Sequence, residues 1–195
     1  MAIPAKITNF LDKNKIKYEV IKHKTVYTAF DKAATLRVPP KIIGKTLVIK
    51  LDPIGKPSAS NGTSKNTALV LIPANKNLDK QKLKKIAKTK SIEFVTESSM
   101  KKIFEGINSH TKRGQGAKGA KIDKVSRRCG VGVKIGAVPP FGSLWKLQTF
   151  VDRGLVQNPK IIVNSGDYNF SLKISPAVLK KIPDLVINNF SVAKK

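Results

Sequence analysis

Hydrophobic positions along the chain follow two different periods, which predicts a mixture of helices and strands. Apolar residues recur at helical spacing in residues 3–14, 28–38 and 78–88, and Thr28 is a suitable N-cap for the second of these helices. Residues 16–22 alternate in the way that a half-buried strand does. Further elements are predicted between these segments: strands over 42–52, 67–74 and 91–95, and a helix over 98–106.

The C-terminal third continues this mixture. We predict strands and tight loops over 131–142, 147–152, 160–166 and 170–175, and one or two final helices over 175–190 with Ser175 as the cap. Strands and helices do not alternate regularly, so the pattern favours the α+β class. A chain of 195 residues can bury one core, and we expect a single domain over 1–195.

The chain carries a large positive charge, which favours a polyanionic partner. Lys and Arg number 38 against 12 Asp and Glu, a formal net charge of +26, and such a field attracts nucleic acid at long range. Two alternatives to a nucleic-acid partner stay open. A lysine-rich proteome raises the charge of all its proteins, and an anionic membrane would also attract the chain, although no amphipathic anchor is present. Charge alone does not select a particular nucleic acid.

Neither a signal peptide nor a membrane span is predicted. The N-terminal residues turn polar before an apolar signal core could form, and no apolar run approaches the roughly 20 residues that a span needs. The single cysteine, Cys129, rules out an internal disulfide and fits a reducing compartment. We therefore expect a cytoplasmic protein without membrane contact.

Most active-site templates are missing from the sequence. It has no Walker-type phosphate loop, no dinucleotide-binding fingerprint and no nucleophile elbow. His23, His110 and Cys129 have no carboxylates at a spacing that would complete a zinc site, and Cys129 is more typical of a loop residue than of a Cys–His dyad. We expect neither a metal nor a cofactor.

Two local features carry possible chemistry. Lys45 interrupts an apolar strand, so its ammonium either points into a cleft or lies on the outer face of an edge strand. Residues 136–142, with the sequence Gly-Ala-Val-Pro-Pro-Phe-Gly, form a turn that two prolines stiffen. Its glycines let backbone N–H groups approach a ligand as oxyanion donors do, and a plain tight turn is the alternative.

Taken in order, these features resemble the YbaK/prolyl-tRNA synthetase-associated editing family. The similarity combines a lysine before Thr-Leu-Val, a Gly-x-x-x-Pro loop and a late Val-Asn-x-Gly strand. The matching segments cover most of the chain outside two insertions, and they are 23–50, 71–87, 134–142, 147–156 and 160–179. The resemblance implies a mixed β-barrel core surrounded by helices.

The resemblance also implies an activity, hydrolysis of the ester that joins an amino acid to the terminal ribose of a tRNA. Lys45 would hold the terminal phosphate or the aminoacyl-adenosine end, and Gly136 would begin the loop whose amides face the aminoacyl carbonyl. The residues implied to contact the substrate are Tyr27, Thr28, Ala137, Val138, Pro140 and Ser171. A small amino acid such as Ala, Cys, Ser or Pro is the expected substrate, and a synthetase is a further expected partner.

Three departures from the family pattern affect these expectations, and one is Asn75, which stands where Asp is common before the helix. Ser171 stands where some members have a pocket carboxylate, which leaves open whether catalysis is retained. The basic segment 109–128 is longer than the usual connection, and we interpret it as a tRNA-binding arm rather than a solvated insertion. Its expected phosphate contacts are Lys112, Arg113, Lys118, Lys121, Lys124, Arg127 and Arg128.

Two rival hypotheses use the same observations. The chain could be a catalytically inactive adaptor of the same fold that binds tRNA or a synthetase. A sequence-specific DNA-binding protein is the weaker rival, because the sequence contains no helix-turn-helix or zinc finger.

Overall fold

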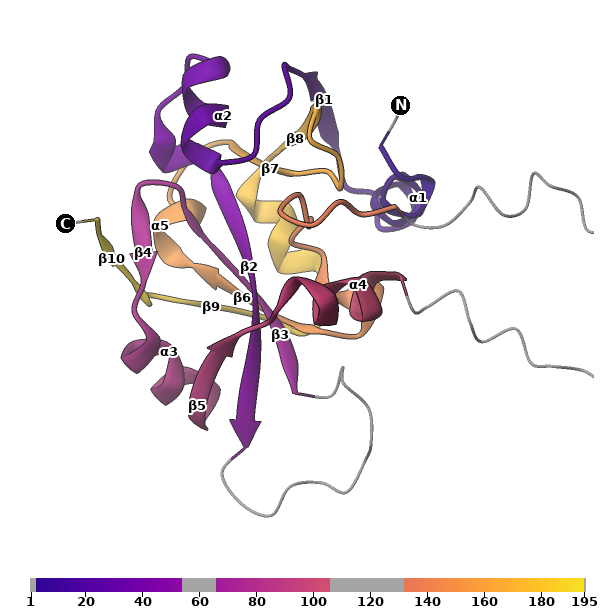
Figure 1. The fold of residues 1–195 in the computed structure, drawn as a ribbon. Helices are drawn as coiled ribbons and strands as arrows, with labels where there is room; N and C mark the ends of the chain where they lie inside the picture. Colours follow the sequence, from indigo (N-terminus) through magenta and orange to yellow (C-terminus); the bar gives the residue numbers. More distant parts are fainter. Residues whose placement is uncertain (1–2, 54–65, 106–131, 195) are drawn as a thin grey trace, which may run out of the picture.

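The computed structural model describes residues 3–53, 66–105 and 132–194, and its largest sheet has five strands. In spatial order these strands are β5 (Thr89–Phe94), β2 (Gly44–Pro53), β3 (Thr67–Pro73), β6 (Gln148–Asp152) and β9 (Leu185–Asn188). β2 runs antiparallel to β3 and β5, whereas the β3–β6 and β6–β9 pairs are parallel. The sheet is therefore mixed, with β5 and β9 at its edges (Figure 1).

Two smaller sheets flank the large one. The first is antiparallel and has the order β1 (Tyr18–Lys22), β8 (Phe170–Ile174) and β7 (Ile161–Asn164). The second pairs β4 (Lys76–Leu78) with β10 (Ser191–Ala193). A bridge from Ile43 to Ile162 joins the first sheet to the start of β2.

The α+β class is confirmed, and the barrel is not. Within the described ranges, the strands form three separate sheets that do not close into a barrel. Helices accompany these sheets, and they are α1 (Ala5–Lys13), α2 (Ala29–Thr35), α3 (Lys80–Ala87), α4 (Glu97–Glu105) and α5 (Arg153–Val156), with short 3-10 helices η1 (Pro40–Ile42), η4 (Gly142–Trp145) and η5 (Pro176–Lys181).

The core lies on both faces of β3, all of whose residues are buried. Leu69 and Leu71 pack in one cluster with residues of α1 and α4, whereas Val70 and Ile72 pack in another with Leu83 of α3. Successive strand side chains point to opposite faces, so a strand covered on both faces has a continuous apolar run. In the described part of the chain, no helix has both the length and the apolar character that a membrane crossing requires.

Most predicted elements are present, but of the one or two final helices predicted over 175–190 only the short 3-10 helix η5 forms. After η5 the chain forms β9 and β10 instead. Pro183 cannot continue a helix. The apolar run over 185–187 instead pairs with β6 as a parallel edge strand. Ser175 does precede η5, but its side chain makes no capping hydrogen bond. Residues 132–141 contain no strand, because Pro139 and Pro140 lack the N–H that a ladder needs.

Candidate functional site

A cleft with a volume of about 120 Å³ lies beside the first residues of β2. Its walls come from four parts of the chain: α2 with the segment that leads into it, β2, the loop before η4, and the turn between β7 and β8. In that order, the lining residues are Val26, Tyr27, Thr28, Ala29, Lys32, Lys45, Thr46, Gly136, Ala137, Asn164, Asp167 and Tyr168. The fold thus gathers polar groups that are far apart in the sequence.

The start of α2 is fixed by its cap. The Thr28 hydroxyl accepts a hydrogen bond from the Asp31 N–H at 3.0 Å and donates one to the Asp31 carboxylate at 2.7 Å, which confirms the predicted cap. One turn later Lys32 points inward, with 6% of the residue exposed. Its Nζ donates a hydrogen bond of 2.6 Å to Oδ1 of Asn164, at the end of β7. The cap therefore directs a lysine into the cleft.

Lys32 is buried without a carboxylate partner among the described residues. Burial lowers its pKa from 10.5 to about 8, because an environment of low polarity disfavours the charged form. The Lys32 ammonium therefore loses its proton closer to neutral pH than an exposed lysine does.

Asn164 also fixes the loop that precedes η4. Its Nδ2 donates to the carbonyl oxygens of Gly136 and Val138, each at 3.4 Å. Gly136 has a φ of 86°, a conformation that strains residues with a Cβ. The Ala137 N–H is used inside the loop, where it donates to the Lys134 carbonyl at 2.9 Å. The Gly136 N–H has no partner in the described part of the chain and is available to a ligand.

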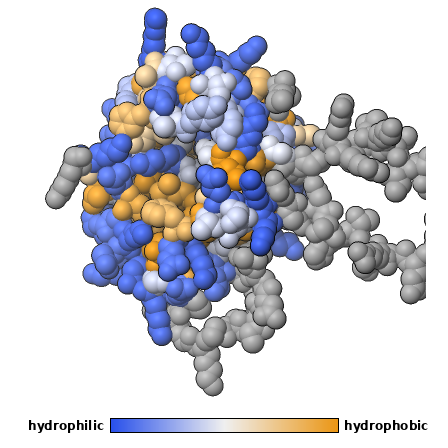
Figure 2. All heavy atoms as spheres, viewed as in Figure 1, coloured by the Kyte–Doolittle hydropathy of each residue, from blue (hydrophilic) through white to orange (hydrophobic). Residues whose placement is uncertain are grey.

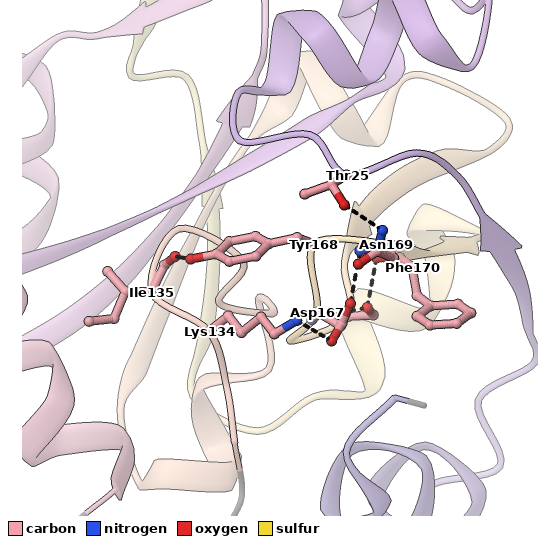
Figure 3. Close-up of polar contacts among 8 residues, drawn as sticks. Thr25, Lys134, Ile135, Asp167, Tyr168, Asn169 and Phe170 are labelled. Atoms are coloured by element: carbon pink, nitrogen blue, oxygen red, sulfur yellow. Dashed lines mark hydrogen bonds and ion pairs between the residues drawn. The ribbon is translucent and has the colours of Figure 1, made fainter. Parts of the chain in front are cut away.

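The turn between β7 and β8 is fastened to the same loop (Figure 3). Lys134 Nζ lies 2.8 Å from Oδ2 of Asp167, and the Tyr168 hydroxyl donates to the Ile135 carbonyl. The Tyr168 ring contacts both the Lys134 ammonium, which is 5.1 Å from its centroid, and the Tyr27 ring, whose centroid is also 5.1 Å away in an edge-on contact. These contacts hold two cleft walls in register.

Asp167 is held as a carboxylate. Burial would raise its pKa, but hydrogen bonds from Lys134 and from the Asn169 N–H at 2.8 Å, with the positive charge of Lys134, lower the pKa below its usual value. Asn169 is itself held by a bond of 2.7 Å to the Thr25 hydroxyl. The charged Asp167 carboxylate therefore stabilises the turn through its contacts with Lys134 and the Asn169 N–H.

Lys45 and Thr46 bring β2 to the cleft. Lys45 is half-buried, and its pKa is lowered by burial and then by the charge of Lys194. The Thr46 hydroxyl is buried and has no hydrogen-bond partner among the described residues. An unpaired buried hydroxyl costs about 1–3 kcal/mol. Thr46 also lines the cleft, so among the described residues this wall contains a polar group without a partner.

The sequence profile of the aminoacyl-tRNA editing domain matches residues 23–111 and 115–182. The chain belongs to the aminoacyl-tRNA editing domain family. This membership confirms the resemblance seen in the sequence, and the cleft is made from residues within the matched ranges. The sequence has no significant match among curated proteins.

Solved structures share the editing-domain fold. A crystallised hypothetical protein is 19% identical with a TM-score of 0.69, and the alignment covers 96% of this chain and 99% of that one. A candidate trans-editing enzyme for prolyl tRNA synthetase is 16% identical with a TM-score of 0.68, and 99% of each chain is covered. A candidate signal transduction protein from Marinobacter aquaeolei VT8 is 10% identical with a TM-score of 0.60, and 98% of this chain covers 31% of that one. At these identities the likeness concerns the fold.

Several residues predicted from the sequence meet in the editing-domain cleft, namely Tyr27, Thr28, Lys45, Gly136 and Ala137. Lys45 therefore faces a cleft rather than the outer side of an edge strand. Val138 and Pro140 belong to the same loop but are buried and do not line the cleft, and Val138 packs in the main core cluster. The predicted tRNA contacts lie outside the described residues, and they are Lys112, Arg113, Lys118, Lys121, Lys124, Arg127 and Arg128.

Ser171 lies on β8, fully buried and outside the cleft lining. Its hydroxyl is 2.9 Å from Nε2 of His23, whose Nδ1 is 2.8 Å from the Lys24 carbonyl. A carbonyl can only accept, so Nδ1 carries the hydrogen and, in the neutral ring, Nε2 accepts from Ser171. The structure therefore places the Ser171 hydroxyl in a contact with the residue that follows β1 and gives the cleft a different carboxylate, Asp167.

Sequence reasoning missed the other polar residues of the editing-domain cleft, which are Lys32, Thr46, Asn164, Asp167 and Tyr168. Asn164, Asp167 and Tyr168 lie in one short run, Val-Asn-Ser-Gly-Asp-Tyr. The pattern of this run indicates the end of a strand but does not indicate a role for its side chains. Lys32 gave no signal, because a helix lysine is normally solvated. In the described ranges, no three His, Cys, Asp or Glu side chains are grouped to hold a metal ion.

Proposed function

We propose that this chain acts in the cytoplasm as a trans-editing deacylase. It hydrolyses the ester between a small amino acid, such as Ala, Cys, Ser or Pro, and the terminal ribose of a mischarged tRNA. One observation carries the proposal: Tyr27, Lys45 and Gly136 meet in a single cleft of a chain from the aminoacyl-tRNA editing domain family.

The size of the cleft supports a small amino acid. Its volume of about 120 Å³ is well below the roughly 300–1,000 Å³ of pockets that hold drug-sized ligands. Tyr27 and Tyr168 both line this cleft and contact each other edge-on.

The chemistry of the cleft supports ester hydrolysis. An aminoacyl ester is already activated, so positioning of water and stabilisation of an oxyanion provide much of the rate. Gly136 offers a backbone N–H that has no partner among the described residues, and Lys45 supplies a point charge for the terminal phosphate of the tRNA. The nucleophile is water or a substrate group. The Lys32–Asn164 bond positions the loop that carries Gly136.

The test is a deacylation panel of tRNAs charged with small amino acids. Wild-type protein should release one or a few of them, and Lys45→Ala should lower kcat/KM for release by about 10- to 100-fold, since a hydrogen bond to a charged group contributes about 1.5–3 kcal/mol. Lys50→Ala is the matched control, because Lys50 is an exposed lysine on the same strand. Full activity in Lys45→Ala would overturn the site assignment.

The alternative is an adaptor of the same fold that binds tRNA or a synthetase without catalysis. The net charge of +26 still favours tRNA binding, but Ser171 no longer argues for a changed pocket, because it lies outside the cleft lining. Binding of tRNA with no release from any charged tRNA in the panel would establish the adaptor instead.

We also propose that the basic segment 109–128 contacts tRNA phosphates. Each phosphate contact removed should reduce the slope of log K against log salt by about 0.9 on duplex regions. Replacement of Lys112, Arg113 and Lys118 with Gln should therefore flatten the salt dependence of tRNA binding. An unchanged slope would support the solvated insertion instead.

A further inference from the structure

A second, larger groove begins on the other side of Lys45. Its volume is about 620 Å³, and Lys45 lines both this groove and the cleft. Leu47 of β2 and Phe94 of β5 contribute apolar walls, Val192 of β10 closes one side, and Lys80 stands at the start of α3. Figure 2 shows hydrophobic side chains gathered in the area between β4 and β2, with hydrophilic ones around them.

Among the exposed large apolar side chains of the described ranges, all but Val20 line or adjoin the groove and the cleft. The large hydrophobic residues exposed in the described ranges are Val20 (47%), Tyr27 (73%), Phe30 (42%), Phe94 (54%) and Val192 (39%). Phe94 and Val192 line the groove, and Tyr27 lines the cleft. Phe30 contacts Lys194, whose charge acts on Lys45. Scattered exposed apolar residues are ordinary, but a cluster around a lysine marks a binding surface.

Lysine ammonium groups lie against two aromatic rings of this surface. Lys80 Nζ lies 4.5 Å from the centre of the Phe94 ring, and Lys194 Nζ lies 4.4 Å from that of Phe30. Asp79, an acidic residue of the groove, is the N-cap of α3, and its carboxylate is 3.6 Å from Lys82 Nζ. Its charge is thus partly neutralised by its own helix.

Aromatic faces beside lysines match the chemistry of unpaired nucleotides. Bases stack on aromatic side chains whatever their identity, and phosphates meet the neighbouring cations. A paired duplex cannot offer its base faces in this way, because they are already stacked. The groove volume of about 620 Å³ is also within the range of roughly 300–1,000 Å³ that encloses a small ligand.

We propose that this groove holds the unpaired 3′-terminal nucleotides of an RNA, with a base stacked on Phe94 and a phosphate at Lys45, next to the cleft. The inference rests on the proposed function in one respect, namely that the same RNA carries the aminoacyl ester into the cleft. Lys45 then separates the two sites: the ester lies on one side of its ammonium and the preceding bases on the other.

The experiment measures binding of an uncharged, fluorescein-labelled single-stranded RNA, ACCA, by fluorescence anisotropy at several salt concentrations. Phe94→Ala should weaken binding about tenfold, since loss of one stacking partner costs about 1–3 kcal/mol. Phe94→Trp should bind at least as tightly as wild type, and Phe94→Leu should bind as weakly as Phe94→Ala. Lys80→Gln should reduce the salt slope by about 0.7, the value for one phosphate contact on a single strand.

Two controls make the result specific. Val20→Ala removes an apolar side chain of similar exposure on β1, outside the groove and the cleft, and should leave affinity unchanged. A blunt-ended RNA hairpin should bind wild type and Phe94→Ala equally. Because Phe94 is mostly exposed, its variants should unfold at the wild-type temperature.

The outcomes separate this inference from the proposed function. Equal binding of ACCA by wild type and Phe94→Ala, or no binding by wild type at low salt, would overturn the inference. A protein partner would then be the remaining candidate for the groove. The assay uses RNA without an ester, so its result does not depend on whether the protein deacylates tRNA. If the protein has deacylase activity but its RNA binding does not depend on Phe94, the proposed role of the groove is refuted and the proposed function is not.

Discussion

The two hollows on either side of Lys45 are built in opposite ways. The cleft is small, and its polar groups are tied to one another by Lys32, Asn164 and Asp167. The groove is larger and has apolar walls with Phe94 exposed in them, and Lys80 lies over the Phe94 ring. A network of buried hydrogen bonds fixes geometry, whereas stacking and charge supply affinity with little demand on geometry. We therefore expect chemical selectivity from the cleft and RNA affinity from the groove.

The largest expected effect concerns the buried cation of the cleft. Below about pH 8 the folded protein must bury a charged Lys32, and this penalty fades as the pH rises from about 8 towards the ordinary value of 10.5. The unfolded chain binds more protons in this window, so stability rises with pH. Lys32→Met has no such penalty. The free energy of unfolding of wild type should therefore gain on the order of 3 kcal/mol relative to Lys32→Met between pH 7 and 10.5.

Urea unfolding of both proteins across this pH range measures the difference. A difference that does not change with pH would show that Lys32 is solvated, and the contrast between a cleft with a buried cation and an open groove would lose its main support.

The next effect concerns Asn164, the partner of Lys32. Asn164→Ala should lower the free energy of unfolding by about 2 kcal/mol, because a hydrogen bond to a charged group contributes about 1.5–3 kcal/mol. Asn158→Ala is a matched control: its side-chain amide donates to two backbone carbonyls of α5, outside the cleft. Both variants should bind ACCA like wild type.

Deacylation should fall in Asn164→Ala and not in Asn158→Ala, because only the former releases the Gly136 loop. Equal deacylation by the two variants would contradict a positioning role for Asn164. Weakened ACCA binding in Asn164→Ala alone would mean that the cleft and the groove are not separate.

The smallest stability effect is expected at Thr46. Thr46→Val removes a buried hydroxyl without a described partner, so stability should stay within about 1 kcal/mol of wild type and increase if it changes at all. The kcat/KM for deacylation should fall nonetheless, because the substrate would lose a polar contact. Calorimetry and steady-state kinetics measure the two quantities. Unchanged kcat/KM would mean that no ligand atom uses this hydroxyl.

Much of the fold could be predicted from local pattern, and most of the cleft could not. The apolar run of β3, the period of α3 and the Thr28 cap are local features, and each is present as predicted. The local pattern predicts helices where the C-terminal strands form, because β9 exists only where the edge of β6 is open to it. A short apolar run does not itself distinguish strand from helix.

The sequence by itself determined the class of the fold, the positive charge, and the pair of Lys45 and the Gly136 loop, because these depend on residue type and order. Only the tertiary structure determined that Lys32 is buried. In the sequence it has the context of an ordinary helix lysine, whereas in the fold it is a buried cation that donates to Asn164. The same holds for Phe94, whose strand alone does not show that its ring stays exposed beside Lys80. Burial and ligand access depend on neighbours from distant parts of the chain, and these are fixed only when the sheets and helices pack.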